Sequence, residues 1–323
     1  MKKGYFILLS IILVAWSIYM LSNNLLFLFN ENWLVSTTMI FASFIAWSTA
    51  EWWWAVAFPV FTKLLNIAWD DAKVFSLMIQ SIGMSMAMFV IWIKKIKVLK
   101  NVILWWAVWG LLWQILGLSI VLSSIQLKVL FTVLVTFLWV VLASSLIKKE
   151  YLYKNEIFST FKTITSFIVI WLVWGLLTSK MWTGIDMIIF ILLTMFYWIN
   201  AKISTPTTIC LMAINSIFWF IISLYTWWIT NIVITYWLVS IPVVILFAPI
   251  WAIIASKISQ KVLISILLFF IFLDITSTVY TVNFTSQVII FTLQAILLAI
   301  SFFYIMYFIK TNYVLKQEKV KIK

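Results

Sequence analysis

The sequence predicts an all-α, polytopic membrane protein with about 10–12 transmembrane or half-membrane helices. Its 323 residues are 66% hydrophobic and only 10% charged, whereas a soluble domain is nearer half apolar and a quarter charged. The mean hydropathy is +1.16, and most apolar runs have roughly the 20 residues that a helix needs to cross a bilayer. All 22 basic residues are lysines, and they gather in short loops between these runs.

The net charge of +13 therefore indicates positive cytoplasmic loops rather than a nucleic-acid partner. We expect a multi-pass protein of a bacterial plasma membrane with both termini in the cytoplasm. The chain has no histidine, and Cys210 is its one cysteine. This composition excludes disulfides, Cys/His metal sites and histidine-based catalysis, so we expect no metal and no cofactor.

Apolar runs and polar loops divide the chain into segments of helical length. Helices are predicted at residues 5–29, 33–50, 52–67, 72–93, 101–123, 128–147, 163–179, 184–200, 203–225, 232–256, 262–282 and 287–309. The predicted organisation is an extra N-terminal helix (1–32), a first repeat (33–147), a cytoplasmic linker (148–162), a second repeat (163–282), and a C-terminal helix with a basic tail (283–323).

Two interruptions break this pattern, at residues 50–59 and 179–186. The first places Glu51, three consecutive tryptophans and a proline within an apolar run, and the second places charged residues and a glycine there. Broken helices at membrane depth are tolerated where the freed backbone is buried in protein or lines a cavity. A pair of such breaks in corresponding positions of two halves is typical of a transporter binding site.

An internal repeat relates the two halves. Residues 76–82 (Ser-Leu-Met-Ile-Gln-Ser-Ile) resemble residues 210–217 (Cys-Leu-Met-Ala-Ile-Asn-Ser-Ile), and each follows an Ala-Lys pair, at 72–73 and 201–202. Each predicted repeat crosses the membrane an odd number of times. The two repeats are therefore expected to have inverted topologies, with one broken hairpin in each.

Tryptophan usage is unusual, because the chain has 22 tryptophans and only 6 glycines. Membrane helices normally carry more glycine than soluble ones. Trp105, Trp109 and Trp113 recur at the four-residue spacing that small residues use for close helix packing. Our hypothesis is that many tryptophans stand where the functional protein has glycine. The cause would be a UGA codon that the host reads as glycine but that was translated as tryptophan. The alternative is a protein that is truly rich in interfacial tryptophan, and an intact mass of native protein distinguishes the two.

With tryptophan read as glycine, residues 51–59 resemble the Gly-Gly-Gly…Pro signature of the sulfite exporter TauE/SafE family. Residues 204–208 (Ser-Thr-Pro-Thr-Thr) resemble the family's Thr-Ser segment, residues 105–113 its glycine-zipper helix, and residues 248–252 its Pro-x-Gly element. The resemblance covers about residues 35–280, and the written tryptophans depart from it where the family has small residues. It implies a permease for small oxoanions such as sulfite, sulfonates or related organic acids.

An anion in such a site is expected to contact backbone amides at the breaks and nearby polar side chains. The predicted substrate-binding residues are Glu51, Trp52, Trp53, Trp54, Ser76, Gln80, Ser81, Trp182, Thr183, Gly184, Thr205, Thr207, Thr208 and Asn215. Lys63 or Lys202 are further candidates, since the chain has no arginine to clamp an anion. The alternative for each hydroxyl or amide is a bond to its own backbone or to a neighbouring helix.

Three acids lie within or near apolar runs, and intramembrane carboxylates are functional candidates by default. Glu51 and Asp186 are predicted to bind the coupling ion, although Glu51 is also suited to pair with a helix end or a lysine. Asp186 is equally placed to interact with a helix N-terminus. Asp274 lies in the middle of a predicted helix, and the sequence suggests no partner for it.

These observations favour a secondary carrier that is not an enzyme, with a small anion and the lipid bilayer as partners and a possible homo-oligomeric state. One alternative is an intramembrane enzyme acting on lipid-linked substrates, which would need clustered carboxylates, histidines or a metal site. Another is a non-transporting membrane scaffold, which would explain neither the twin breaks nor the repeat. The chain also has no nucleotide-binding loop.

Overall fold

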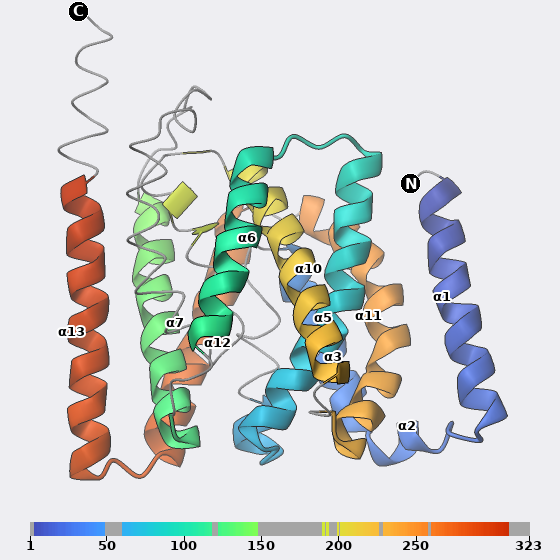
Figure 1. The fold of residues 1–323 in the computed structure, drawn as a ribbon, viewed down its shortest axis with the longest axis horizontal. Helices are drawn as coiled ribbons and strands as arrows, with labels where there is room; N and C mark the ends of the chain where they lie inside the picture. Colours follow the sequence, from blue (N-terminus) through green and yellow to red (C-terminus); the bar gives the residue numbers. More distant parts are fainter. Residues whose placement is uncertain are drawn as a thin grey trace, which may run out of the picture.

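The computed structural model describes residues 3–48, 60–117, 122–147, 189–190, 192–193, 199, 201–225, 229–257 and 260–309. Within these ranges every regular element is a helix, and the long helices stand side by side as a bundle (Figure 1). The all-α prediction is therefore confirmed.

The helix boundaries follow the apolar runs of the sequence. The elements are α1 (Lys3–Ser22), α2 (Leu28–Glu31), α3 (Trp33–Ser48), η1 (Val60–Leu64), α5 (Trp69–Ile93), α6 (Lys100–Gly117), α7 (Ser124–Ile147), α10 (Ala201–Tyr225), α11 (Asn231–Lys257), α12 (Gln260–Thr281) and α13 (Ser286–Ile309). From α10 onward, each predicted helix ends within a few residues of its observed position.

The prediction of one continuous helix over residues 5–29 is wrong. The α1 helix ends at Ser22 because Asn24 has a φ of 53°, a left-handed conformation that closes a helix. The amide of Leu25 donates to the carbonyl of Met20 at 2.9 Å, and the amide of Asn24 donates to that of Leu21 at 3.2 Å. These two bonds satisfy carbonyls at the helix end, so the chain turns here before α2.

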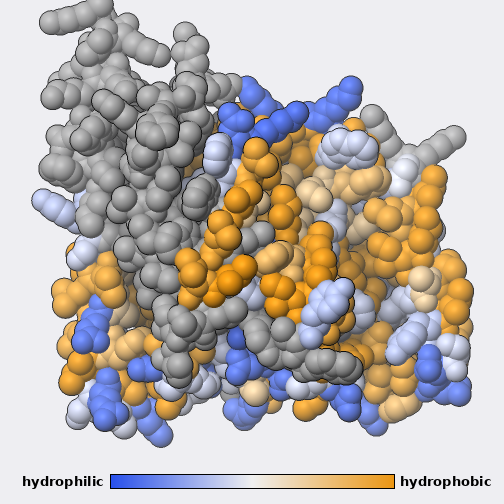
Figure 2. Space-filling model, in the orientation of Figure 1, coloured by the Kyte–Doolittle hydropathy of each residue, from blue (hydrophilic) through white to orange (hydrophobic). Residues whose placement is uncertain are grey.

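Three described helices are long and apolar enough to cross a membrane, judged by length and composition: Gly4–Ser22, Trp69–Ile93 and Ile203–Tyr225. Four shorter apolar helices accompany them, at Trp33–Ser43, Ser124–Phe137, Asn231–Phe247 and Ser286–Ser301. A broad hydrophobic surface lies between hydrophilic residues at the two ends of the bundle (Figure 2). The protein is therefore membrane-embedded.

The α5 helix is the centre of the bundle. It packs against α10 and α11, while α3 covers α11, α6 packs against α10, and α7 contacts both α12 and α13. The amide of Leu99, after the end of α5, donates to Thr207 near the start of α10 at 3.1 Å. At the opposite end of α5, Thr230 donates to Asp71 at 2.8 Å. The α5 and α10 helices are therefore antiparallel.

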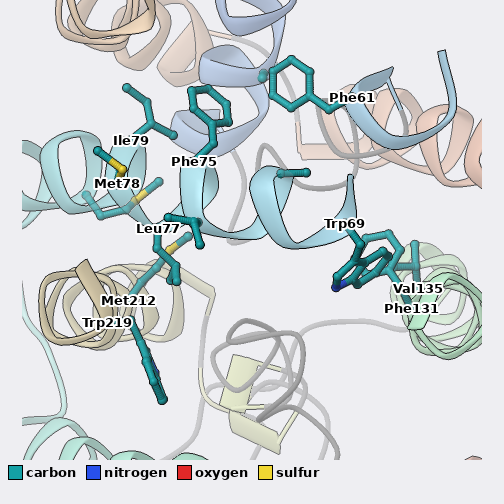
Figure 3. Close-up of a cluster of buried hydrophobic side chains, with 14 of the residues drawn as sticks. Phe61, Trp69, Phe75, Leu77, Met78, Ile79, Phe131, Val135, Met212 and Trp219 are labelled. Carbon is teal, nitrogen blue, oxygen red and sulfur yellow. The ribbon is translucent and has the colours of Figure 1, made fainter. Parts of the chain in front are cut away.

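Close contacts and aromatic rings fix α5 in this position. A Cβ atom added at Gly83 would lie 3.1 Å from a methyl group of Val244 on α11, so α5 and α11 approach closely at this glycine. Phe75 stacks edge-on against Phe61 of η1, with ring centroids 5.1 Å apart. At the start of α5, Trp69 lies beside Phe131 of α7 (Figure 3).

A proline in α11 explains how α1 is attached. Pro242 has no N–H group, so the carbonyl of Leu238, four residues earlier, lacks its helical partner. The indole of Trp16 donates to this carbonyl at 2.8 Å, and the hydroxyl of Ser36 on α3 donates to the neighbouring carbonyl of Val239 at 3.3 Å. Trp16 thus makes a side-chain bond that a glycine at this position would lack.

Candidate functional site

The structure describes seven of the predicted substrate-binding residues: Ser76, Gln80, Ser81, Thr205, Thr207, Thr208 and Asn215. The others, together with the predicted coupling-ion residues, lie outside the described residues: Glu51, Trp52, Trp53, Trp54, Trp182, Thr183, Gly184 and Asp186. The described candidates all lie on α5 and α10.

Ser76 and Gln80 form a buried polar pair on α5. They are 0% and 2% exposed, and the Gln80 amide donates to the Ser76 hydroxyl at 3.3 Å. Because Ser76 accepts this bond, its own proton remains for another acceptor. The next residue, Ser81, instead donates to the carbonyl of Met78 in its own helix at 2.7 Å.

Lys73 extends this polar face toward the start of α5. Residues 73, 76 and 80 have the spacing that places side chains on one side of a helix. The Lys73 side chain is only 10% exposed, and its ammonium group donates to Asp70, which is 83% exposed, at 2.9 Å. Lys73 therefore adds a positive charge to the helix side that carries Ser76 and Gln80, with its ammonium group bonded to Asp70. Sequence reasoning used Lys73 only as a marker of the repeat, although its spacing to Ser76 and Gln80 was visible.

The threonines of α10 occupy a different place. Thr207 donates to the carbonyl of Ile203 at 2.7 Å and accepts the amide of Leu99, while Thr208 donates to the carbonyl of Thr205 at 2.9 Å. The hydroxyls of Thr207 and Thr208 thus bond to their own helix. Thr207 also fixes the loop that follows α5.

The described candidates do not form one cluster. Ser76 lies in the first third of α5 and Thr205 to Thr208 in the first third of α10. Since these helices are antiparallel, the two groups lie toward opposite ends of the packed pair. Gln80 and Ser81 on α5 and Asn215 on α10 lie nearer the middle of the pair.

A second buried polar group lies where α7 packs against α12. Asp274 is 1% exposed, Thr278 3% and Thr132 9%. The Thr132 hydroxyl lies 3.2 Å from the Asp274 carboxyl and 2.7 Å from the Thr278 hydroxyl. Thr278 also donates to the backbone carbonyl of Asp274 at 3.0 Å. Sequence reasoning found no partner for Asp274, because Thr132 is 142 residues away along the chain.

The short element η1 contacts the two helices that carry these polar groups, α5 and α12. It is a π-helical turn, a rare form that occurs frequently at functional sites, with the amide of Leu65 bonded to the carbonyl of Val60 at 2.9 Å. It directly follows the predicted interruption at residues 50–59, and it packs against both α5 and α12. The chain leaving the first interruption therefore contacts both helices that carry buried polar groups.

The described residues before α10 repeat this geometry. Residues 192–193 are also π-helical, and the amide of Ile199 donates to the carbonyl of Leu193 at 2.8 Å. Before α5, the amide of Ile67 donates to the carbonyl of Phe61 at 2.9 Å. In both bonds the donor lies six residues after the acceptor in the sequence. Each donor also lies two residues before the start of a helix of 25 residues.

No family model, curated protein or solved structure matches the chain. Among the described residues no group of three or more histidine, cysteine, aspartate or glutamate side chains is placed to hold a metal ion.

Proposed function

We propose that the protein is a secondary membrane transporter of the TauE/SafE type that moves small anions, such as sulfite, sulfonates or related organic acids, across the plasma membrane. The observation that carries this proposal is the repeated local geometry before α5 and α10. Each 25-residue helix follows a π-helical turn and a six-residue backbone bond, and the two helices are antiparallel. Broken segments at corresponding positions of two inverted halves are characteristic of secondary transporters.

The packing of the helices supports an inverted repeat. Equivalent positions are 132 residues apart at the helix starts (69 and 201), the helix ends (93 and 225) and the bonded amides (67 and 199). Suppose that α5, α6 and α7 of the first half correspond to α10, α11 and α12 of the second. A contact between α5 and α11 then requires an equivalent contact between α10 and α6, whereas the α5–α10 and α7–α12 contacts are each their own equivalent. All four of these helix pairs are in contact.

This register also bears on the tryptophan-for-glycine hypothesis. It differs by two residues from the sequence match, which pairs Leu77 with Leu211. At a spacing of 132 residues, Trp52 in the first interruption corresponds to Gly184 in the second. This correspondence supports glycine at position 52 of the functional protein, where backbone amides are proposed to meet the anion.

The polar face of α5 is the proposed anion site. Lys73, Ser76 and Gln80 provide one charged and two neutral hydrogen-bonding groups. The Asp70 carboxylate that binds Lys73 is exposed, whereas the Lys73 side chain is only 10% exposed. In this proposal an arriving anion takes the place of Asp70 beside Lys73.

Flux measurements in liposomes test the proposal. Purified protein reconstituted in liposomes is expected to accumulate or exchange sulfite, thiosulfate or a small sulfonate above the level of empty liposomes. K73M and Q80L are expected to reduce this flux strongly, whereas K100M at the start of α6 removes one exposed lysine charge elsewhere and serves as the control. A reconstituted protein that moves none of these anions would refute the transport function. Equal loss in K73M and K100M would refute only the site.

A further inference from the structure

We infer that Asp274, Thr132 and Thr278 form a proton-binding site at the α7–α12 contact, and that this site carries the coupling proton of the transporter. The second half of this statement rests on the proposed function, and the first half does not. Three contacts of 3.2, 2.7 and 3.0 Å join oxygen atoms of these residues in a buried part of the bundle.

In one arrangement of the protons the carboxyl group is protonated. Three contacts each need one proton, but Thr132 and Thr278 have one hydroxyl proton each. The contact from Thr278 to the backbone carbonyl of Asp274 uses the Thr278 proton, because a carbonyl only accepts. The contact between the two hydroxyls then uses the Thr132 proton. The remaining contact, 3.2 Å between Thr132 and Asp274, is satisfied when Asp274 is protonated and donates to Thr132.

Loss of the proton reverses this chain of bonds. When the O–H bond of Asp274 breaks, its electron pair stays on the carboxylate and the proton passes to water. Thr132 then donates to the carboxylate and Thr278 donates to Thr132. The backbone carbonyl of Asp274 loses its bond from Thr278 but keeps one from Ser277, whose hydroxyl lies 2.8 Å away. Both protonation states are therefore hydrogen-bonded, as a reversible site requires.

The location of the cluster suits ion coupling. Asp274 is on α12, which contacts η1, and η1 also contacts α5, the helix that carries Lys73, Ser76 and Gln80. The element η1 therefore gives a change at Asp274 on proton release a direct route to the helix of the proposed anion site. Among the described elements that pack against α12, the charged residues are Lys128 of α7, one turn before Thr132, and Lys63 of η1. On α12 itself, Lys261 is 13 residues away from Asp274, about 20 Å along the helix.

Infrared spectroscopy tests the proton site without any transport. The chain has only nine acidic residues, so few carboxyl bands compete. We expect the purified protein to show the carbonyl band of a buried protonated carboxylic acid, which shifts in D2O and disappears in D274N. D70N removes an exposed acid and is expected to leave this band unchanged.

Valine substitutions test the role of the hydroxyls. T132V is expected to shift the frequency of the band and the pH at which it disappears, because it removes the direct partner of the carboxyl. T136V is the matched control on α7, since the Thr136 hydroxyl donates to the backbone of its own helix at 2.7 Å. A wild-type protein without the band at any pH would overturn the inference, as would a band that persists in D274N. Stabilisation by sodium that D274N abolishes would also overturn it, because the ion would then be sodium.

Transport measurements then test coupling. D274N is expected to lose anion accumulation driven by a pH gradient while retaining exchange of anion for anion across the membrane. Full gradient-driven accumulation by D274N, with the infrared band still assigned to Asp274, would disprove the coupling role alone. Absence of all anion flux in the wild type would refute the proposed function and leave the proton site standing.

Discussion

The central helices and the α7–α12 pair use their polar side chains differently. On α5 and α10, Ser81, Thr207 and Ser216 all donate to carbonyls of their own helix. Across the α7–α12 contact, Thr132 bonds to side chains of the other helix. The central helices are therefore positioned mainly by shape, through contacts such as that of Gly83 with Val244, whereas α7 and α12 are joined by directional bonds.

This difference separates two uses of a hydroxyl group inside a membrane. A hydroxyl bonded to its own backbone needs nothing from a neighbouring helix and adds little to helix association. A hydroxyl bonded across helices, next to a buried carboxyl group, constrains both partners and marks a functional candidate.

Substitution of Gly83 by leucine is expected to cause the greatest loss of stability. A Cβ atom at this position already approaches Val244 to 3.1 Å, and overpacking typically costs about 1–3 kcal/mol. The free energy of unfolding in mild detergent, measured by denaturant titration, is expected to fall by this amount. V244A in the same protein is expected to restore part of the lost free energy of unfolding.

The control is G4L, because a Cβ atom at Gly4 has no neighbour closer than 3.9 Å. Equal loss from G4L and G83L would contradict the idea that shape positions α5.

Removal of the Thr132 hydroxyl is expected to have the next largest effect. T132V keeps the shape of the side chain but removes bonds to Asp274 and Thr278. Hydrogen bonds between membrane helices contribute about 0.6 kcal/mol on average and up to about 1.7 kcal/mol. The unfolding free energy is therefore expected to fall by about 1 kcal/mol, with no measurable change for T136V. A larger loss from T136V than from T132V would show that the cross-helix bonds do not hold this pair.

The sequence alone predicted the long helices well and the polar contacts poorly, for a physical reason. Residues 72–93 and 203–225 form apolar runs that only a membrane or a core can accommodate, so hydropathy predicts α5 and α10 almost to their ends. The partner of Asp274 depends on which helices pack together, which hydropathy does not encode. The end of α1 at Ser22 was missed because Asn24 adopts its left-handed conformation in a run that otherwise reads as continuous.

The candidate site was predictable only in part. Ser76 and Gln80 are one turn apart on a helix, so their pairing follows from local spacing. The expected convergence of Ser76 with Thr205 and Thr207 ignored the antiparallel packing of α5 and α10. That packing places the first thirds of the two helices at opposite ends of the pair.

Substitution of Trp16 by phenylalanine is expected to have a smaller effect that depends on Pro242. W16F removes the indole bond to the carbonyl of Leu238, and a bond of this kind contributes about 0.5–1.5 kcal/mol. In a P242A background the amide of the new alanine bonds to the same carbonyl, so W16F is expected to cost less there. A double-mutant cycle of unfolding free energies measures this coupling.

Trp237 provides the contrast for Trp16. Its indole N–H is buried, with no acceptor within hydrogen-bonding distance among the described residues. W237F is therefore expected to be neutral or slightly stabilising.

If W16F instead has the same effect in the wild type and in the P242A background, this result would contradict the assignment of Trp16 as the partner that replaces the missing amide of Pro242.

The smallest effect on stability is expected for Ser81, and for that reason its substitution is the most informative about transport. Ser81 and Ser216 are buried serines that each bond to the carbonyl three residues earlier, at 2.7 Å and 3.1 Å. S81A and S216A are both expected to change the unfolding free energy little, because each hydroxyl bonds to the backbone of its own helix. Only Ser81 directly follows Gln80 of the proposed anion face, so S81A is expected to raise the anion concentration needed for half-maximal flux while S216A leaves it unchanged. Because stability is the same in the two variants, a difference in flux reports contact with the anion. Equal flux in both variants would show that Ser81, like Ser216, serves only its own helix.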